Sequence, residues 1–182
     1  MRHRNRTIGA ALVVGALAVT VAACGSSSSS SAATTGNSGT TAASSNTASA
    51  SDPVVFDANA KTAAVFVVAG QSGGLNFDGK QNGGLSITVP AGWKVTITCR
   101  NDGNLPHSCA IVDPTSQAIA LTGASTPDPT TGFNPGSAES FSFAASTPGS
   151  YRLACLVPGH EDGGMWATFT VSSSTTTPQL HT

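Results

Sequence analysis

Short stretches of alternating apolar and polar residues, broken by glycine and proline turns, constrain the fold of this 182-residue chain more than any other feature. Seven stretches show period-two patterning or runs of β-branched residues, both typical of strands. They are residues 62–68, 85–89, 94–99, 107–112, 139–143, 151–155 and 166–171. Turn sequences such as Asp78-Gly79 and Pro148-Gly149 separate them, and no segment shows a helical apolar stripe. We therefore expect an all-β fold, a Greek-key sandwich or barrel of about seven to eight strands.

The N-terminal residues are typical of an export signal. Arg2, Arg4 and Arg6 precede an apolar run that ends near residue 23 and is shorter than the roughly 20 residues of a membrane-spanning helix. The run leads into Val21-Ala22-Ala23-Cys24, which resembles a bacterial lipobox. We expect residues 1–23 to be a lipoprotein signal peptide and Cys24 to be the lipid attachment site. An ordinary cleaved signal or an uncleaved anchor is the alternative.

Composition divides the rest of the chain into a folded part and two polar flanks. Residues 25–51 are almost entirely Ser, Thr, Ala, Gly and Asn, so we expect residues 24–51 to form a lipid-anchored, disordered tether. Residues 52–172 are long enough for one domain with one core, and residues 173–182 are expected to be a flexible tail. After the signal, five of the eight basic residues remain against nine acidic ones, which gives no indication of nucleic acid binding.

The stretch CLVPGHEDGGM, from Cys155 to Met165, places a thiol, an imidazole and a thioether in one loop between two expected strands. A core cysteine, a surface histidine and a core methionine are the simplest explanation of each residue by itself. Their concentration argues otherwise, because Met165 is the only methionine after Met1. His107 offers a fourth ligand. Two imidazoles, a thiolate and a weak axial thioether are the ligand set of blue-copper sites, whereas a structural zinc site normally lacks methionine.

These residues and their surroundings resemble the cupredoxin family, closest to sulfocyanin and more distantly to rusticyanin. The resemblance covers about 100 residues and rests on LNFDGKQNGGLSITVPAGWKVTITCRNDGNLPHS and YRLACLVPGHEDGGMWATFTV. It implies a cupredoxin-like sandwich that binds one type 1 copper ion. The implied copper ligands are His107, Cys155 and His160, with Met165 as the axial ligand.

Three residues beside these ligands carry further expectations. By resemblance to cupredoxins, Ser108 would tie the two ligand-bearing segments together through a hydrogen bond near the Cys155 loop. A solvent-facing strand serine is the alternative. Glu161 and Asp162 lie inside the ligand loop and are expected to be solvated, with no role as ligands.

Cys99 and Cys109 are the two cysteines not yet assigned. Cys99 shares a strand face with Val95 and Ile97, and Cys109 shares one with His107, so both are expected to point into the sandwich. In an oxidising compartment two such cysteines most simply form a disulfide, which would brace the strand that carries His107. Two buried free thiols are the alternative.

Together these expectations describe a one-electron carrier rather than an enzyme, held by its lipid at the outer face of the cell membrane. We expect a monomer whose partners are a redox protein donor and acceptor in the membrane or cell envelope. The electron is expected to leave through His160, within an apolar patch formed with Pro158, Leu105 and Pro106. The alternative is an extracytoplasmic copper storage or delivery protein, although such sites are usually richer in Met or Cys. A copper oxidase would need further histidines, and after the expected signal peptide only His181 is left over.

Overall fold

The computed structural model describes residues 47–182, so the expected signal peptide, Cys24 and most of the expected tether lie outside the described residues. The described part contains nine strands and one short 3-10 helix, η1 (Gln71–Gly73). The strands are β1 (Val54–Asp57), β2 (Thr62–Ala69), β3 (Ser86–Pro90), β4 (Lys94–Asn101), β5 (Ala110–Val112), β6 (Ala138–Ala144), β7 (Gly149–Ala154), β8 (Trp166–Ser172) and β9 (Gln179–His181). Within these residues, no helix has the length and apolar character needed to cross a membrane.

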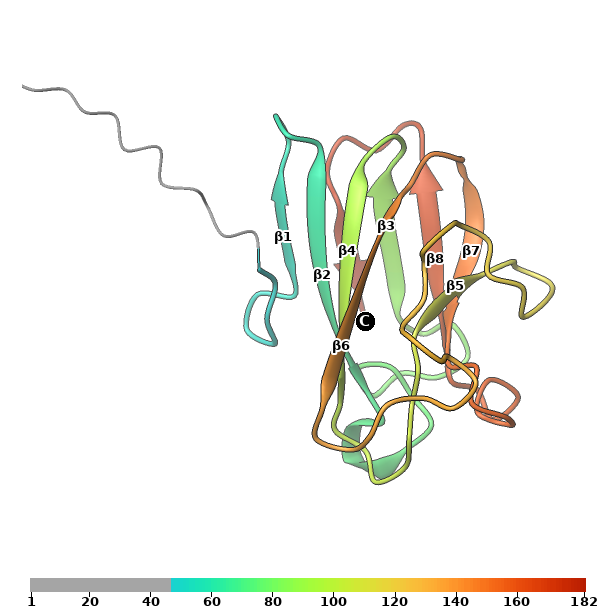
Figure 1. Ribbon diagram of the computed structural model, residues 1–182. Coiled ribbons are helices and arrows are strands. Elements are labelled where there is room, and N and C mark those ends of the chain that lie inside the picture. Colours follow the sequence, from blue (N-terminus) through green and yellow to red (C-terminus); the bar gives the residue numbers. More distant parts are fainter. Residues whose placement is uncertain (1–46) are drawn as a thin grey trace, which may run out of the picture. The chain divides into compact units, whose positions relative to one another are not determined.

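The strands form two sheets, which confirms the expected all-β sandwich (Figure 1). One sheet has the order β1-β2-β4-β6, and the other has the order β5-β7-β8-β3-β9. Each sheet contains one parallel pair, β2 with β4 and β3 with β8, and all its other pairs are antiparallel. Because parallel neighbours need a crossover connection, the chain passes repeatedly between the two sheets.

Strand β4 shows how the alternating sequence sets this arrangement. Val95, Ile97 and Cys99 are fully buried between the sheets. The threonines between them face outward, where Thr96 and Thr98 form hydroxyl hydrogen bonds of 2.7 and 2.8 Å to serines of β6. A shift of one residue in register would bury these hydroxyls and expose the apolar side chains, so the pattern fixes the register.

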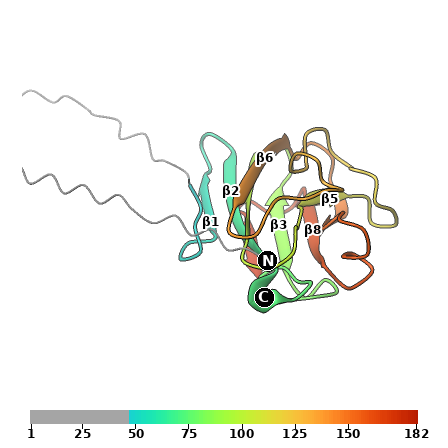
Figure 2. The same cartoon turned by 60° about the horizontal axis from the view of Figure 1, so that its bottom comes forward.

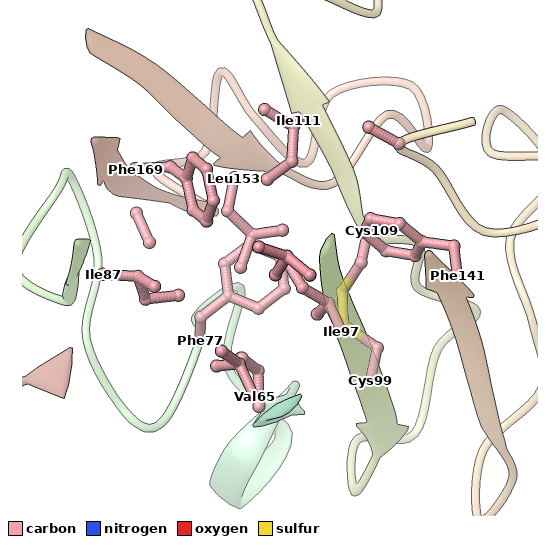
Figure 3. Packing of buried hydrophobic residues seen from close by; sticks show 14 of the residues in the cluster. Val65, Phe77, Ile87, Ile97, Cys99, Cys109, Ile111, Phe141, Leu153 and Phe169 are labelled. Carbon is pink, nitrogen blue, oxygen red and sulfur yellow. A yellow bond between two sulfur atoms is a disulfide. The ribbon is translucent and has the colours of Figure 1, made fainter. Parts of the chain in front are cut away.

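The core between the sheets is continuous and includes a disulfide (Figure 3). Phe77, Ile97 and Phe169 are among its largest fully buried side chains. Cys99 on β4 is bonded to Cys109, just before β5, with 6.5 Å between their Cα atoms. The disulfide expected from the sequence is confirmed, and it links the two sheets next to the segment that carries His107.

Three parts of the chain differ from the sequence-based expectation. Strands β1 and β9 were not among the seven predicted, and β5 covers only the last three residues of the predicted strand 107–112. Strand β9 lies within residues 173–182, for which we expected a flexible tail, and pairs with β3 through residues 179–181. Leu180 packs against the core, but one apolar residue in three is too short a pattern to predict a strand.

The expected site residues lie at one end of the sandwich. Strands β2, β4 and β7 end there and β8 begins there, so the loops that follow β4 and β7 lie at the same end, the lower one in Figure 1. Figure 2 turns this end toward the viewer, with β1 and β2 on one side and β5 and β8 on the other. Residues far apart in the sequence therefore reach one location.

Candidate metal centre

His107 is held at the end of a loop by backbone and side-chain hydrogen bonds. Its N–H donates to the carbonyl of Phe133 at 3.2 Å, and the N–H of Phe133 donates back at 2.8 Å. Asn101, the fully buried last residue of β4, braces this loop, because its side-chain amide donates to the carbonyls of Leu105 (2.9 Å) and Phe133 (3.0 Å). The position of His107 is therefore fixed by Phe133 and Asn101, which are themselves held by hydrogen bonds.

The loop from Cys155 to Met165 closes on itself between β7 and β8. The N–H of Cys155 donates to the carbonyl of Met165 at 3.2 Å, and the N–H of Met165 donates to the carbonyl of His160 at 3.0 Å. Gly159, with φ of +81°, makes the turn just before His160 in a conformation that favours glycine. Met165 is fully buried, so the expected axial ligand lies inside the domain next to the other two loop residues.

The side chains of His107, Cys155 and His160 converge. The two Nδ1 atoms are 3.2 Å apart, and Sγ of Cys155 lies 3.4 Å from Nδ1 of His160 and 4.0 Å from Nδ1 of His107. All three ligand atoms lie within 4.8 Å of one another. The residues are 1%, 0% and 8% exposed, in sequence order. Three soft or borderline donors aimed at one buried point fit a single copper ion.

Ser108 connects the two ligand-bearing segments. Its N–H donates to Sγ of Cys155 at 3.2 Å, and its hydroxyl lies 3.6 Å from the same sulfur. The hydroxyl also accepts a hydrogen bond from the N–H of Leu156 at 2.8 Å. Ser108 is fully buried, so the structure places it as the resemblance implied and not on a solvent-facing surface.

Burial shifts the pKa of all three converging groups toward the neutral form. Burial, and secondly the charge of His160, lowers the pKa of His107 to about 4, and burial also lowers the pKa of His160. Burial raises the pKa of the Cys155 thiol, which the N–H groups of Ser108 and Val157 oppose. Neutral imidazoles are ready to bind a cation, and a bound cation offsets the cost of a buried thiolate.

The far edge of the His107 ring lies against glycine backbone. A Cβ placed on Gly70 would lie 2.5 Å from Nε2 of His107, and one on Gly103 would lie 2.8 Å from it. Gly70 also has φ of +73°, so both conformation and space require glycine there. The ring of His107 is thus confined on the side opposite the converging atoms.

Glu161 is not solvated, so the expectation for this residue is wrong. It is only 7% exposed, and its carboxylate lies 2.7 Å from a guanidinium nitrogen of Arg152 on β7. Asp162, by contrast, is exposed as expected. No sequence pattern indicates that Glu161 pairs with Arg152. The sequence-based expectations also did not include the buried Asn101. The alternation of β4 could have predicted it, because Asn101 lies two residues after Cys99 and continues the inward face of Val95, Ile97 and Cys99.

The residues expected to form the electron-exit patch lie at the same end of the domain. Leu105 is 47% exposed, and Pro106 and Pro158 are exposed as well. His160 is the more accessible of the two converging histidines, at 8% against 1% for His107.

A two-sheet sandwich with a buried cluster of two histidines and one cysteine at one end defines the cupredoxin class of copper proteins. Comparison with known proteins is more specific: a model of the sulfocyanin (SoxE) domain matches residues 49–182. The chain therefore belongs to the sulfocyanin family, and as a blue copper protein it binds one copper ion.

The chain is also similar to individual known proteins. The chain is 29% identical over 139 residues to the sulfocyanin of Sulfolobus acidocaldarius, across 68% of this chain and 70% of that protein. Among solved structures it is similar to auracyanin of Roseiflexus castenholzii, with 26% identity, a TM-score of 0.47, and coverage of 60% of this chain and 96% of that one. Auracyanin A of Chloroflexus aurantiacus gives 20% identity, a TM-score of 0.44, and coverage of 61% and 99%.

Proposed function

We propose that this protein is a one-electron carrier, not an enzyme, and that its copper is bound by His107, Cys155 and His160 with Met165 as the axial ligand. The observation that carries this proposal is the convergence of Nδ1 of His107, Sγ of Cys155 and Nδ1 of His160 at one buried point. Copper supplies the chemistry by alternating between Cu(II) and Cu(I).

Residues around the site fix the proposed copper ligands in positions that suit both Cu(II) and Cu(I). The N–H of Ser108 points at the sulfur of Cys155 and stabilises it as a thiolate. The hydrogen bonds of Asn101 fix the His107 segment, and those of Met165 close the other loop. A site that needs little rearrangement suits electron transfer. Its burial also favours transfer over copper storage or delivery, because metal exchange requires access.

The visible spectrum after addition of Cu(II) tests the proposed function. Wild-type protein should develop an intense thiolate-to-copper charge-transfer band. Cys155→Ser should abolish it, because the band needs a thiolate donor. A matched variant, Ser142→Ala on the outer face of β6, should keep it. A colourless protein that retains zinc, or a blue Cys155→Ser variant, would show that the proposed ligand set is wrong.

The electron is proposed to leave through His160 within the patch formed with Pro158, Leu105 and Pro106. An exposed apolar surface suits a brief encounter with a redox partner, because weak redox complexes have small interfaces. Leu105→Lys should leave the spectrum intact and slow electron exchange between oxidised and reduced protein. Ile119→Lys, at an equally exposed apolar residue of another loop, should leave the rate near wild type. Equal rates in wild type and Leu105→Lys would mean a different exit.

Anchoring at the outer face of the cell membrane is proposed from the sequence of the N-terminal residues, with redox proteins of the membrane or envelope as donor and acceptor and the carrier as a monomer. Residues 1–23 would be the signal, residues 24–51 the lipid-bearing tether and residues 52–172 the cupredoxin domain. Cys24→Ser should shift the protein from the detergent phase to the aqueous phase in a partition assay. Identical partitioning of wild type and variant would contradict the lipid anchor.

A further inference from the structure

An ion pair between the buried Glu161 and the half-buried Arg152 involves the loop that carries three of the proposed ligands. Glu161 follows His160 in the chain, and its carboxylate lies 2.7 Å from Arg152, which precedes Cys155 by three residues on β7. Glutamate is almost never fully buried unless it is paired. The pair therefore has to be explained, and it lies beside the proposed copper site, because Glu161 directly follows the proposed ligand His160.

Arg152 contacts more than the carboxylate. A terminal guanidinium nitrogen donates to the carbonyls of Asp113 at 3.3 Å and Ser116 at 3.1 Å. The guanidinium carbon lies 5.9 Å from the ring centroid of Trp166, which follows Met165 and begins β8. One side chain on β7 thus joins the ligand loop, the segment after β5 and the start of β8.

The pair also affects the charge beside the metal. Glu161 directly follows the proposed ligand His160, so its carboxylate places a negative charge beside the metal site. An anion close to copper favours Cu(II) over Cu(I), and Arg152 opposes this effect with a charge of opposite sign. The balance between the two side chains should therefore influence the reduction potential.

We propose that Arg152 and Glu161 are positioning residues that fix the His160 segment and keep the charge beside the copper nearly neutral, and thereby set the reduction potential. The inference rests on the proposed copper ligands. It assigns a role to two residues that would bind neither copper nor a redox partner.

A double-mutant cycle on the full-length, copper-loaded protein tests the charge balance by redox titration. Arg152→Met should lower the reduction potential, because it leaves the carboxylate uncompensated. Glu161→Gln should raise it, and the double variant should return close to wild type. Asp162→Asn removes the same charge from the next residue, which is exposed, and should shift the potential less than Glu161→Gln. An unchanged potential in Arg152→Met, or an equal shift in Asp162→Asn, would overturn the proposal.

Amide hydrogen exchange in the copper-free, full-length protein tests the fixing of the loop without any reference to copper. In Arg152→Met the amides of residues 156–165 should exchange roughly tenfold faster or more, because the loop loses its ion pair with β7 and Glu161 is left buried without a partner. Arg152→Lys keeps the charge but loses the forked contacts, so it should show faster exchange with a potential near wild type. Unchanged exchange in both variants would exclude the positioning role. If wild-type protein failed to become blue, the proposed function would fail while this measurement still decided the role of the pair.

Discussion

Replacing Ser108 with alanine isolates the contribution of one buried hydroxyl to the copper site. The variant keeps the backbone N–H that donates to Sγ of Cys155 at 3.2 Å. It loses the hydroxyl that accepts from the N–H of Leu156 at 2.8 Å and lies 3.6 Å from the sulfur. The main effect should therefore fall on the link between the two segments rather than on the sulfur.

The magnitude follows from the group left without a partner. Leu156 is 8% exposed, so its N–H would lose a hydrogen bond in a nearly dry environment. An unsatisfied buried donor costs about 1–3 kcal/mol. For a domain of this size, that corresponds to a fall of roughly 4–12 °C in the unfolding midpoint. The blue absorption should persist, because all four proposed ligands remain.

Thermal and urea unfolding of the copper-free protein would measure this loss. Ser142→Ala is the matched control, because it removes a serine hydroxyl that is hydrogen-bonded at 2.7 Å to Thr96 on the exposed face of the sheet. An exposed substitution of this kind should change the stability by no more than about 0.5 kcal/mol. If Ser108→Ala were no less stable than Ser142→Ala, the hydroxyl would not link the segments as described.

Three other perturbations have defined outcomes. Met165→Leu should keep the blue colour and raise the potential in a redox titration, because losing a thioether donor disfavours Cu(II) more than Cu(I); a lower potential would contradict the axial assignment. Replacing Cys99 and Cys109 with alanine should lower the free energy of unfolding by roughly 3 kcal/mol, as the chain-entropy relation gives for their separation of ten residues; an equal urea midpoint would refute this. Copper-free protein should lose stability between about pH 6.5 and pH 4, because folding lowers the pKa of His107 from 6.5 to about 4 and the unfolded chain then binds more protons. Urea midpoints of the copper-free protein should therefore fall as the pH is lowered across this range, and a constant midpoint would contradict the burial of a neutral His107.

The fold was largely predictable because strand alternation is a local signal. Each of the seven predicted stretches has enough apolar residues to show a period of two, and each overlaps an observed strand. Strand β9 has only Leu180 as an apolar residue, and its pairing with β3 depends on a surface that the rest of the domain creates. Such a strand leaves no pattern of its own in the sequence.

The site was predictable to the extent that its residues are rare and close together in the chain. Cys155, His160 and Met165 can be recognised as candidate ligands from their spacing alone. His107 lies far from them in the sequence, and only the fold brings it close to Cys155 and His160. Glu161 could not be recognised, because a glutamate in a glycine-rich loop has the sequence signature of a solvated residue. Its burial depends on Arg152, whose guanidinium reaches it from a neighbouring strand.

The two glycines against His107 make the two sides of the metal site mechanically unequal. Backbone atoms at Gly70 and Gly103 leave no room for the imidazole to swing outward. The other three proposed ligands lie on a single loop, which its internal hydrogen bonds and the Arg152–Glu161 pair hold. If copper required different bond lengths in its two oxidation states, that loop rather than His107 would have to accommodate them. The reorganisation energy of electron transfer in this protein would then depend on the stiffness of eleven consecutive residues.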